Sequence, residues 1–238
     1  MLSEVHNTDC LEYMRSLPDK AFDLAIADPP YGGGQKDGFY HRFGNPNGRF
    51  EKYMRVADGR DLGIEVRKKI VAWDVAPGKE FFDELSRISR NQIIWGANYF
   101  PNMPPTRCFV VWRKLTISEK FTMAMCEYAW TSFDNNAKFV EIAPQGKATD
   151  TRFHPTQKPI ELYAWCIRQF ANKGGKIFDP MMGSQSSRIA AYKMGFDYVG
   201  CELDKEYFDK GCERFNRECL DIRKTDDGKT ITQLHLFE

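Results

Sequence analysis

Four consecutive residues, Asp28, Pro29, Pro30 and Tyr31, directly follow an apolar run at 22–27 that has the length of a buried strand. Ligands bind at the carboxyl ends of strands in an open α/β sheet. Proline has a fixed φ and no N–H group, so the carbonyls of a Pro-Pro pair are rigidly held and free to accept hydrogen bonds. Asp28 adds a carboxylate, and Tyr31 offers a flat ring for stacking. This combination predicts a site for an amino group on a planar ring; the alternative is a strand that ends in a Pro-Pro turn.

A second polar turn follows the apolar run at 176–178. The residues 179–184 read Asp-Pro-Met-Met-Gly-Ser, and a helical pattern begins directly after them. Backbone N–H groups and the helix dipole would face a ligand above such a turn. About twenty residues further on, Glu202 follows a short apolar run at 198–201, and an acid at this spacing suits the hydroxyls of a ribose. The alternative is an ordinary strand-to-helix turn with Glu202 on the surface.

A third group, His154-Pro155-Thr156-Gln157-Lys158-Pro159, directly precedes another helical pattern. It places several polar side chains near one point of the chain. By itself, this segment is better explained as a proline-bracketed loop at the start of a helix.

Strand-like and helix-like segments alternate along the chain, which predicts an α/β fold with a mainly parallel sheet. The expected strands are 22–27, 92–95, 108–112, 123–130, 176–178 and 198–201. The expected helices are 79–89, 159–170, 184–194 and 204–219. Two segments, 32–60 and 134–152, show no clean period and are interpreted as long functional loops.

Composition excludes several classes of protein. The chain has 238 residues, 42% hydrophobic and 28% charged, which predicts one soluble globular domain. No apolar run reaches the roughly 18 residues of a membrane helix, and the N-terminus does not resemble a secretory signal. Seven cysteines without a C-x-x-C spacing and four histidines without a ligand spacing predict neither a disulfide framework nor a metal site.

Taken together, the three motifs resemble those of the DNA amino-methyltransferases, which use S-adenosylmethionine to methylate adenine N6 or cytosine N4. The catalytic motif comes first and the cofactor motif last, as in the permuted beta class of that family. The resemblance runs from about Val5 to Arg214. It implies a Rossmann-like methyltransferase fold with a doubly wound, mainly parallel and circularly permuted sheet. The expected domain is 1–224, with a strand near 3–6.

The resemblance assigns the catalytic role to Asp28, Pro29, Pro30 and Tyr31. Tyr31 is implied to stack on a target base that has left the duplex. Asp28 and the carbonyl of Pro29 are implied to accept hydrogen bonds from the amino group of that base. Transfer is then a direct displacement that depends on positioning and requires no cysteine.

The same resemblance implies a cofactor site. Asp9 would approach the adenine of the cofactor, Glu202 would hold its ribose, and the second and third motifs would enclose its methionine part. The residues expected to bind the cofactor are Asp9, Asp28, Thr156, Gln157, Lys158, Asp179, Met181, Gly183, Ser184 and Glu202.

Two positions depart from the family pattern. Met181 stands where the family commonly has an aromatic residue, and Gln185 stands where it commonly has glycine. A side chain at Gln185 would narrow the turn and reduce cofactor affinity. This feature keeps open the alternative of a DNA-binding protein with an impaired cofactor site.

Contacts with DNA are expected from the loop 32–60, in which basic residues alternate with aromatic ones. The alternative is a solvated lid over the cofactor. The segment 134–152 is expected to help in recognising the target sequence. The residues predicted to contact DNA are Lys36, Tyr40, His41, Arg42, Arg49 and Lys52.

The resulting prediction is a site-specific methyltransferase acting on adenine N6 in double-stranded DNA, because aspartate at the first motif position is typical of adenine enzymes in the family. Cytosine N4 and RNA remain alternative substrates. Related enzymes also imply a homodimer and a cytoplasmic location in a bacterial or phage-infected cell. The tail 225–238 contains Gln233–Phe237, similar to peptides that bind sliding clamps; the alternative is a tail packed on the enzyme itself.

Overall fold

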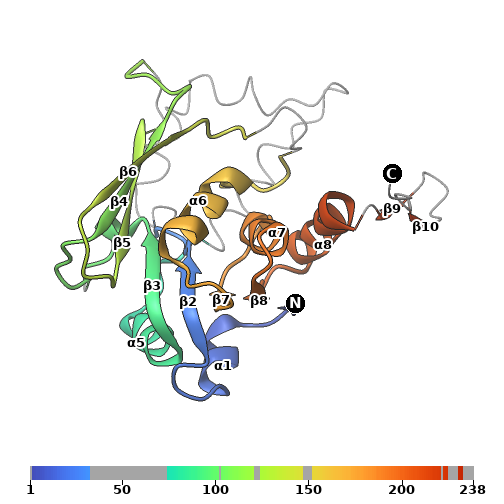
Figure 1. Ribbon diagram of the computed structural model, residues 1–238, viewed down its shortest axis with the longest axis horizontal. Coiled ribbons are helices and arrows are strands. Elements are labelled where there is room, and N and C mark those ends of the chain that lie inside the picture. Colours follow the sequence, from blue (N-terminus) through green and yellow to red (C-terminus); the bar gives the residue numbers. More distant parts are fainter. Residues whose placement is uncertain are drawn as a thin grey trace.

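The computed structural model describes residues 2–32, 74–101, 103–120, 124–146, 152–220, 222–224 and 230–232. An eight-stranded sheet runs through the centre of this part of the chain, in the order β1-β8-β7-β2-β3-β5-β4-β6 (Figure 1). The strands are β1 (Ser3–His6), β2 (Phe22–Ala27), β3 (Ser89–Trp95), β4 (Phe109–Lys114), β5 (Cys126–Thr131), β6 (Lys138–Ile142), β7 (Lys176–Asp179) and β8 (Asp197–Cys201).

The sheet is mainly parallel, as the sequence predicts. Every neighbouring pair is parallel except the two that involve β5, which runs antiparallel to both β3 and β4. β2 lies at the centre, between β7 and β3. The strands that carry the first and second motifs are therefore neighbours in the sheet although they lie far apart in the sequence.

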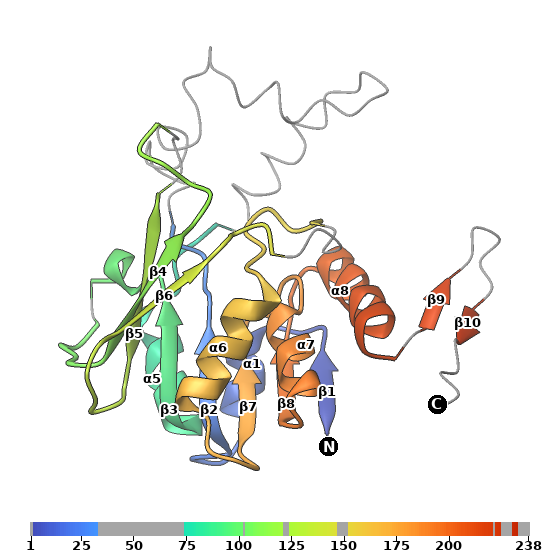
Figure 2. The same cartoon turned by 45° about the horizontal axis from the view of Figure 1, so that its top comes forward.

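Helices cover both faces of the sheet, as in a doubly wound fold (Figure 2). One face packs against α1 (Cys10–Arg15) and α5 (Lys79–Ile88). The other packs against α6 (Ile160–Phe170) and α7 (Ser186–Lys193), and α8 (Lys205–Cys219) packs beside α7. A short 3₁₀ helix, η1 (Ala97–Tyr99), follows β3.

Two hydrophobic cores follow from the alternation of side chains along the strands. In β2, Leu24 and Ile26 belong to the core under α6 and α7, whereas Ala25 and Ala27 belong to the core under α1 and α5. A strand buried on both faces has to be apolar at nearly every position, which explains the continuous apolar run at 22–27.

All the strands and helices expected from the sequence are present, with ends shifted by at most a few residues. The interpretation of 134–152 as irregular throughout was wrong, because 138–142 form β6, which pairs in parallel with β4. A separate two-stranded sheet joins β9 (Ile222–Lys224) to β10 (Thr230–Thr232). Within the described residues, no helix is both long and apolar enough to cross a membrane.

Candidate active site

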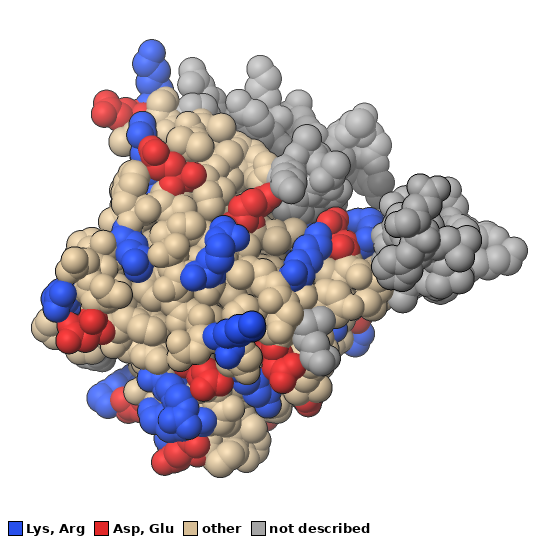
Figure 3. Space-filling view, viewed as in Figure 1, with Lys and Arg blue, Asp and Glu red and all other residues tan. Residues whose placement is uncertain are grey.

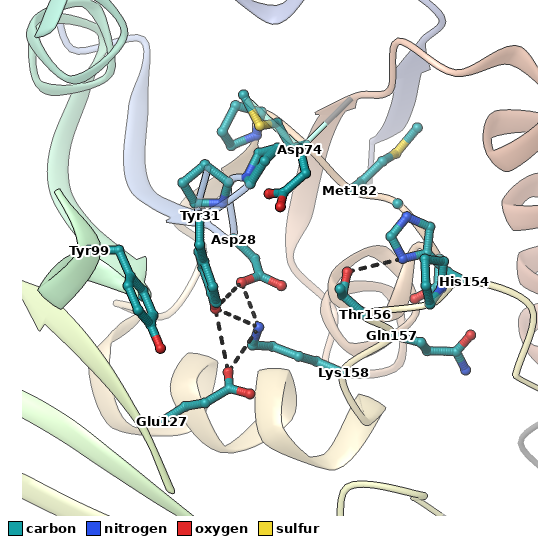
Figure 4. Close-up of a pocket in the computed structure, with 18 of the residues that line it drawn as sticks. Asp28, Tyr31, Asp74, Tyr99, Glu127, His154, Thr156, Gln157, Lys158 and Met182 are labelled. Carbon is teal, nitrogen blue, oxygen red and sulfur yellow. Dashed lines mark hydrogen bonds and ion pairs between the residues drawn. The ribbon is translucent and has the colours of Figure 1, made fainter. Parts of the chain in front are cut away.

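The three sequence motifs line a single cavity of about 1100 Å³ at the carboxyl ends of the central strands. Asp28 follows β2, the turn 180–184 follows β7, and Glu202 follows β8. These strands are parallel neighbours, so their ends lie at the same edge of the sheet. The third motif precedes α6 and brings Lys158 to the same cavity (Figure 4).

Asp28 contacts both Lys158 and Tyr31 directly. The Oδ1 atom of Asp28 lies 2.5 Å from Nζ of Lys158 and accepts a hydrogen bond of 3.0 Å from the hydroxyl of Tyr31. Among the described residues, the Oδ2 atom of Asp28 receives no hydrogen bond. One acceptor oxygen of this carboxylate is therefore available to a ligand.

One face of the Tyr31 ring is covered. The ring of Tyr99 stacks on it, with centroids 4.9 Å apart and planes inclined by 20°. The backbone of Gly96 also approaches the Tyr31 ring closely. A planar ligand that stacks on Tyr31 must therefore use the opposite face.

Lys158 also contacts a second acid from the antiparallel part of the sheet. Its Nζ lies 3.2 Å from Oε2 of Glu127 in β5, and the other carboxylate oxygen of Glu127 lies 2.5 Å from Nζ of Lys114 in β4. Asp28, Lys158, Glu127 and Lys114 thus form a chain of alternating charges in the wall of the cavity. We call these four residues the charge quartet.

Burial and neighbouring charges act in opposite directions on the quartet. Burial raises the pKa of Asp28, although Lys158 opposes this shift. Burial also acts to raise the pKa of Glu127, but Lys158 and Lys114 outweigh it and lower the value to about 2. For Lys158, burial favours the neutral amine, yet the two carboxylates prevail and raise its pKa. Lys158 and Glu127 are therefore both charged at neutral pH.

The turn after β7 is held by Glu202. The N–H group of Gly183 donates to Oε2 of Glu202 at 2.9 Å, and the N–H group of Asp204 donates to Oε1 at 2.8 Å. Gly183 has a φ of +47°, and His154 lies directly against it. Each carboxylate oxygen of Glu202 keeps a further lone pair for a hydroxyl group.

Asp179 lies beneath the turn and is not one of the residues that line the cavity. It is 1% exposed, accepts the N–H of Met181 at 3.0 Å, and accepts the hydroxyl of Ser187 at 2.5 Å. Burial raises its pKa to about 7. Asp179 therefore supports the turn from behind.

Gln185 does not narrow the cavity, contrary to the expectation from its size. Its backbone has a φ of +61°, and its side chain points away from the cavity toward α8. There it donates to the carbonyl of Phe208 at 3.1 Å and accepts from Arg188 at 2.9 Å. Gly211 in α8 provides the space for it.

Most of the other residues expected at the cofactor site line the cavity. Asp9 does so while its Oδ1 atom caps α1 through the N–H groups of Leu11 and Glu12. The remaining expected residues that line the cavity are Thr156, Gln157, Lys158, Met181, Gly183, Ser184 and Glu202, together with the residues predicted to be catalytic, Asp28, Pro29, Pro30 and Tyr31.

The predicted DNA contacts fall outside the described residues. This holds for Lys36, Tyr40, His41, Arg42, Arg49 and Lys52, and also for the clamp-like segment 233–237. On the face drawn in Figure 3, basic and acidic side chains of the described residues are intermixed. The DNA-contact and clamp interpretations stay predictions.

Several residues in the site were not expected from the sequence: Asp74, Gly96, Tyr99, Lys114 and Glu127. Lys114 follows Trp112 by two residues and therefore lies on the same, buried face of β4, which is a usable signal. No comparable sequence signal marks Asp74. It is 3% exposed, its Oδ1 atom accepts the N–H of Gly32 at 3.1 Å, and its Oδ2 atom has no partner among the described residues.

Within the described residues, no group of three or more His, Cys, Asp or Glu side chains is arranged to hold a metal ion.

Comparison with known proteins identifies the family. The sequence model of the DNA methylase family N6_N4_Mtase matches residues 63–213, which is more than half of the chain. The chain belongs to this DNA methylase family. The matched part contains the third motif and the turn after β7, while the tetrapeptide at 28–31 precedes it.

Individual relatives are distant but cover most of the chain. The type II methyltransferase M.ScaI of Streptomyces caespitosus is 23% identical over 253 residues, covering 92% of this chain and 83% of that protein. The type II methyltransferase M1.MboII of Moraxella bovis is 21% identical over 270 residues, covering 87% and 94%.

Solved structures share the fold. TTHA0409 of Thermus thermophilus, in complex with S-adenosyl-L-methionine, matches with a TM-score of 0.52 and 17% identity, covering 92% of this chain and 96% of that one. The cytosine-N4-specific PvuII DNA methyltransferase matches with a TM-score of 0.51 and 13% identity, covering 94% and 93%. The Rossmann-like methyltransferase fold is thus confirmed.

Proposed function

We propose that this DNA methylase transfers a methyl group from S-adenosylmethionine to N6 of adenine in double-stranded DNA, at a specific sequence. One observation carries the proposal: the carboxylate of Asp28, with one oxygen available, shares a cavity with the turn 180–184 and with Glu202. An acceptor for an amino group and a site for a nucleoside cofactor are therefore side by side.

The cavity suits this cofactor in shape and charge. Gly183 lets the backbone come close to a ligand, and Glu202 has lone pairs for two adjacent hydroxyls. The Oδ2 atom of Asp74, which has no partner among the described residues, is a buried carboxylate oxygen that a cationic ligand would stabilise. S-adenosylmethionine, when bound, would supply a methyl carbon that an amino nitrogen attacks as the bond from that carbon to the positively charged sulfur breaks. The leaving group is S-adenosylhomocysteine, and the methylated nitrogen releases one proton.

The residues of the chain position the target. Asp28 Oδ2 and the carbonyl of Pro29 accept the two hydrogens of the amino group, which turns its lone pair toward the methyl group. The face of Tyr31 opposite Tyr99 stacks on the flipped base. Fixed geometry and fixed charges account for the rate, without a covalent bond between enzyme and base.

Adenine is the proposed base because aspartate is the first residue of the tetrapeptide. The family also contains cytosine-N4 enzymes, and a substrate with an amino group beside a ring nitrogen fits the same acceptors. The loop 32–60, with Arg42 and Arg49, is the proposed contact to DNA phosphates.

The proposal is tested with the full chain, unmethylated double-stranded DNA and isotopically labelled S-adenosylmethionine, followed by mass spectrometry of the nucleosides. We expect labelled N6-methyladenine, confined to one sequence context. Asp28→Asn, which keeps the shape but removes the charge, is expected to bind the cofactor and to lose transfer by about a hundredfold or more.

Other products decide between the alternatives. Labelled N4-methylcytosine would keep the mechanism and change the base, and label in RNA alone would change the substrate. Full activity of a folded Asp28→Asn variant would refute the role of Asp28. Absence of both transfer and cofactor binding in the wild-type protein would refute the enzymatic proposal.

A further inference from the structure

Lys158 is shared between two carboxylates. Its Nζ lies 2.5 Å from Asp28 and 3.2 Å from Glu127, and it also donates to the hydroxyl of Tyr31 at 3.3 Å. All three hydrogens of the ammonium group are thereby used. Lys158 is therefore held in a fixed place between the catalytic tetrapeptide and strand β5 (Figure 4).

The second carboxylate is itself held in place. Glu127 lies opposite Trp112 in the ladder between β5 and β4, and Lys114, two residues further along β4, reaches back to Oε1 of Glu127 at 2.5 Å. The hydroxyl of Tyr31 lies 3.5 Å from the other oxygen, Oε2. The antiparallel strands thus place a fixed negative charge next to Lys158, on the side away from Asp28.

The quartet is balanced in charge and removed from water. The side chains of Lys158 and Lys114 are 5% and 8% exposed, and those of Asp28 and Glu127 are 12% and 20% exposed. Burying four charges is costly, and replacing them by apolar side chains would often stabilise a protein. Fold stability alone therefore does not explain why a glutamate occupies position 127.

An ion pair between Asp28 and Lys158 alone would create a problem for the reaction. A lysine that fully neutralises Asp28 would weaken it as an acceptor for the amino group of the base. A second acid that takes part of the charge of Lys158 leaves more of the negative charge on Asp28 for the substrate.

Building on the proposed function, we propose that Glu127 is a positioning residue for methyl transfer. It holds Lys158 between two carboxylates, so that Lys158 keeps Asp28 ionised without fully neutralising it, and Asp28 remains a strong hydrogen-bond acceptor for the target amino group. Lys114 balances the charge of Glu127 and keeps its carboxylate directed at Lys158.

The electrostatic surroundings of Asp28 fix the sign of the expected effect. The groups that act on it are Lys158, which lowers its pKa, and Glu127, which raises it; Tyr31 lowers it through a hydrogen bond. The buried side chains of Tyr163 and Asp179 also have Coulombic interactions with Asp28. Removing the charge of Glu127 therefore lowers the pKa of Asp28 and strengthens its pairing with Lys158.

The experiment measures kcat and KM against pH for the full chain with its DNA substrate. In Glu127→Gln, kcat at neutral pH is expected to fall by roughly tenfold with KM for S-adenosylmethionine nearly unchanged. The acidic limb of the kcat profile, where Asp28 becomes protonated, is expected to move to lower pH. In Lys114→Met the limb is expected to move to higher pH, because Glu127 then draws Lys158 away from Asp28.

Two further variants separate positioning from stability. The double variant Glu127→Gln/Lys114→Met removes one charge of each sign, so it should recover thermal stability relative to Glu127→Gln while keeping the shift to lower pH. Glu127→Asp keeps the charge and should keep the wild-type acidic limb even if kcat falls.

Glu141→Gln is the matched control. Glu141 in β6 pairs with Arg113, the neighbour of Lys114, at 2.8 Å, on the exposed side of the sheet outside the cavity. The Glu141→Gln variant should have the same kcat and the same pH profile as the wild type. The inference is overturned if the wild-type protein is active and the acidic limbs of wild type, Glu127→Gln and Lys114→Met coincide. An inactive wild-type protein would instead count against the proposed function.

Discussion

A methyl group added to Gly96 would come within 2.0 Å of the Tyr31 ring. Gly96 has a φ of +67° and lies directly between β3 and η1, and Tyr99 from that short helix stacks on Tyr31. The turn after β3 therefore fixes the position of the Tyr31 ring, because a side chain at Gly96 would occupy the space of that ring.

Gly96→Ala is predicted to displace Tyr31 and to abolish most of the transfer activity. A misplacement of about 1 Å in a reacting geometry typically costs about a hundredfold in rate, and we expect a loss of kcat of at least about that size. Binding of S-adenosylmethionine should remain nearly unchanged, because Gly96 adjoins Tyr31 and not the turn after β7. Kinetics and calorimetry on the same preparation test both statements.

Gly195→Ala provides the control for backbone strain. Gly195 also has a positive φ, of +76°, but a side chain there would meet no atom within 4 Å. Both variants should lose roughly 1 kcal/mol of stability from the strained backbone. If Gly195→Ala reduced transfer as strongly as Gly96→Ala, the contact with Tyr31 would not be the cause.

Gln185→Gly is predicted to leave cofactor affinity unchanged within about twofold. The side chain of Gln185 points toward α8, so its removal opens no space in the cavity. Loss of its hydrogen bonds costs about 1 kcal/mol each, and removal of this fully buried side chain leaves a void between α7 and α8. Glycine relieves only about 1–2 kcal/mol of strain at the left-handed φ, so stability should fall. Calorimetry and thermal unfolding measure the two quantities; a tenfold gain in affinity would show that Gln185 does constrict the turn.

Asp74→Asn is predicted to stabilise the cofactor-free protein by roughly 1 kcal/mol while weakening the binding of S-adenosylmethionine. The buried Oδ2 atom of Asp74 has no partner among the described residues, so the neutral amide is cheaper to bury. In this variant, by contrast, a cationic ligand no longer has the negative charge of Asp74 to bind to. Uncharged 5′-methylthioadenosine is the matched ligand, and its affinity should not change. Equal losses for both ligands would contradict a role of the charge.

The sequence predicted those features that depend on local pattern. The strand 22–27 was predicted with its observed ends, because an apolar run buried on both faces stops at Asp28 and two prolines. β6 was missed because it is an edge strand: Phe139 is 58% exposed and Val140 is its only buried residue, so no apolar run marks it. Edge strands have less need of apolar residues and therefore give weaker signals.

Contacts between distant segments were the part that could not be predicted. The direction of the Gln185 side chain depends on its left-handed backbone and on the space above Gly211 in another helix. The pairing of Lys114 with Glu127 depends on the register of β4 against β5. That register, which the sequence alone does not give, decides which acid meets the buried Lys114.

Asp179 is predicted to make stability depend on pH near neutrality. Burial raises its pKa from 3.8 to about 7, while the hydroxyl of Ser187, itself bonded to Tyr198, acts against this rise. The folded protein therefore holds a proton that the unfolded chain has already released. This contribution to stability is fully present below about pH 4 and is lost as the pH rises toward about 7 and beyond, by at most about 1.4 kcal/mol per pH unit.

Asp179→Asn removes this titration, so the thermal midpoint of the variant should rise relative to that of the wild type as the pH increases from 4 to 8. The amide can still accept the N–H of Met181 and donate to Ser187, which keeps the turn after β7 in place. Ser187→Ala acts in the opposite sense: losing the hydrogen bond raises the pKa of Asp179 further, so the decline in stability should extend to higher pH. Thermal unfolding of the cofactor-free chain across this range tests both variants. A constant difference between Asp179→Asn and wild type at every pH would show that Asp179 is already ionised throughout the range in the folded protein.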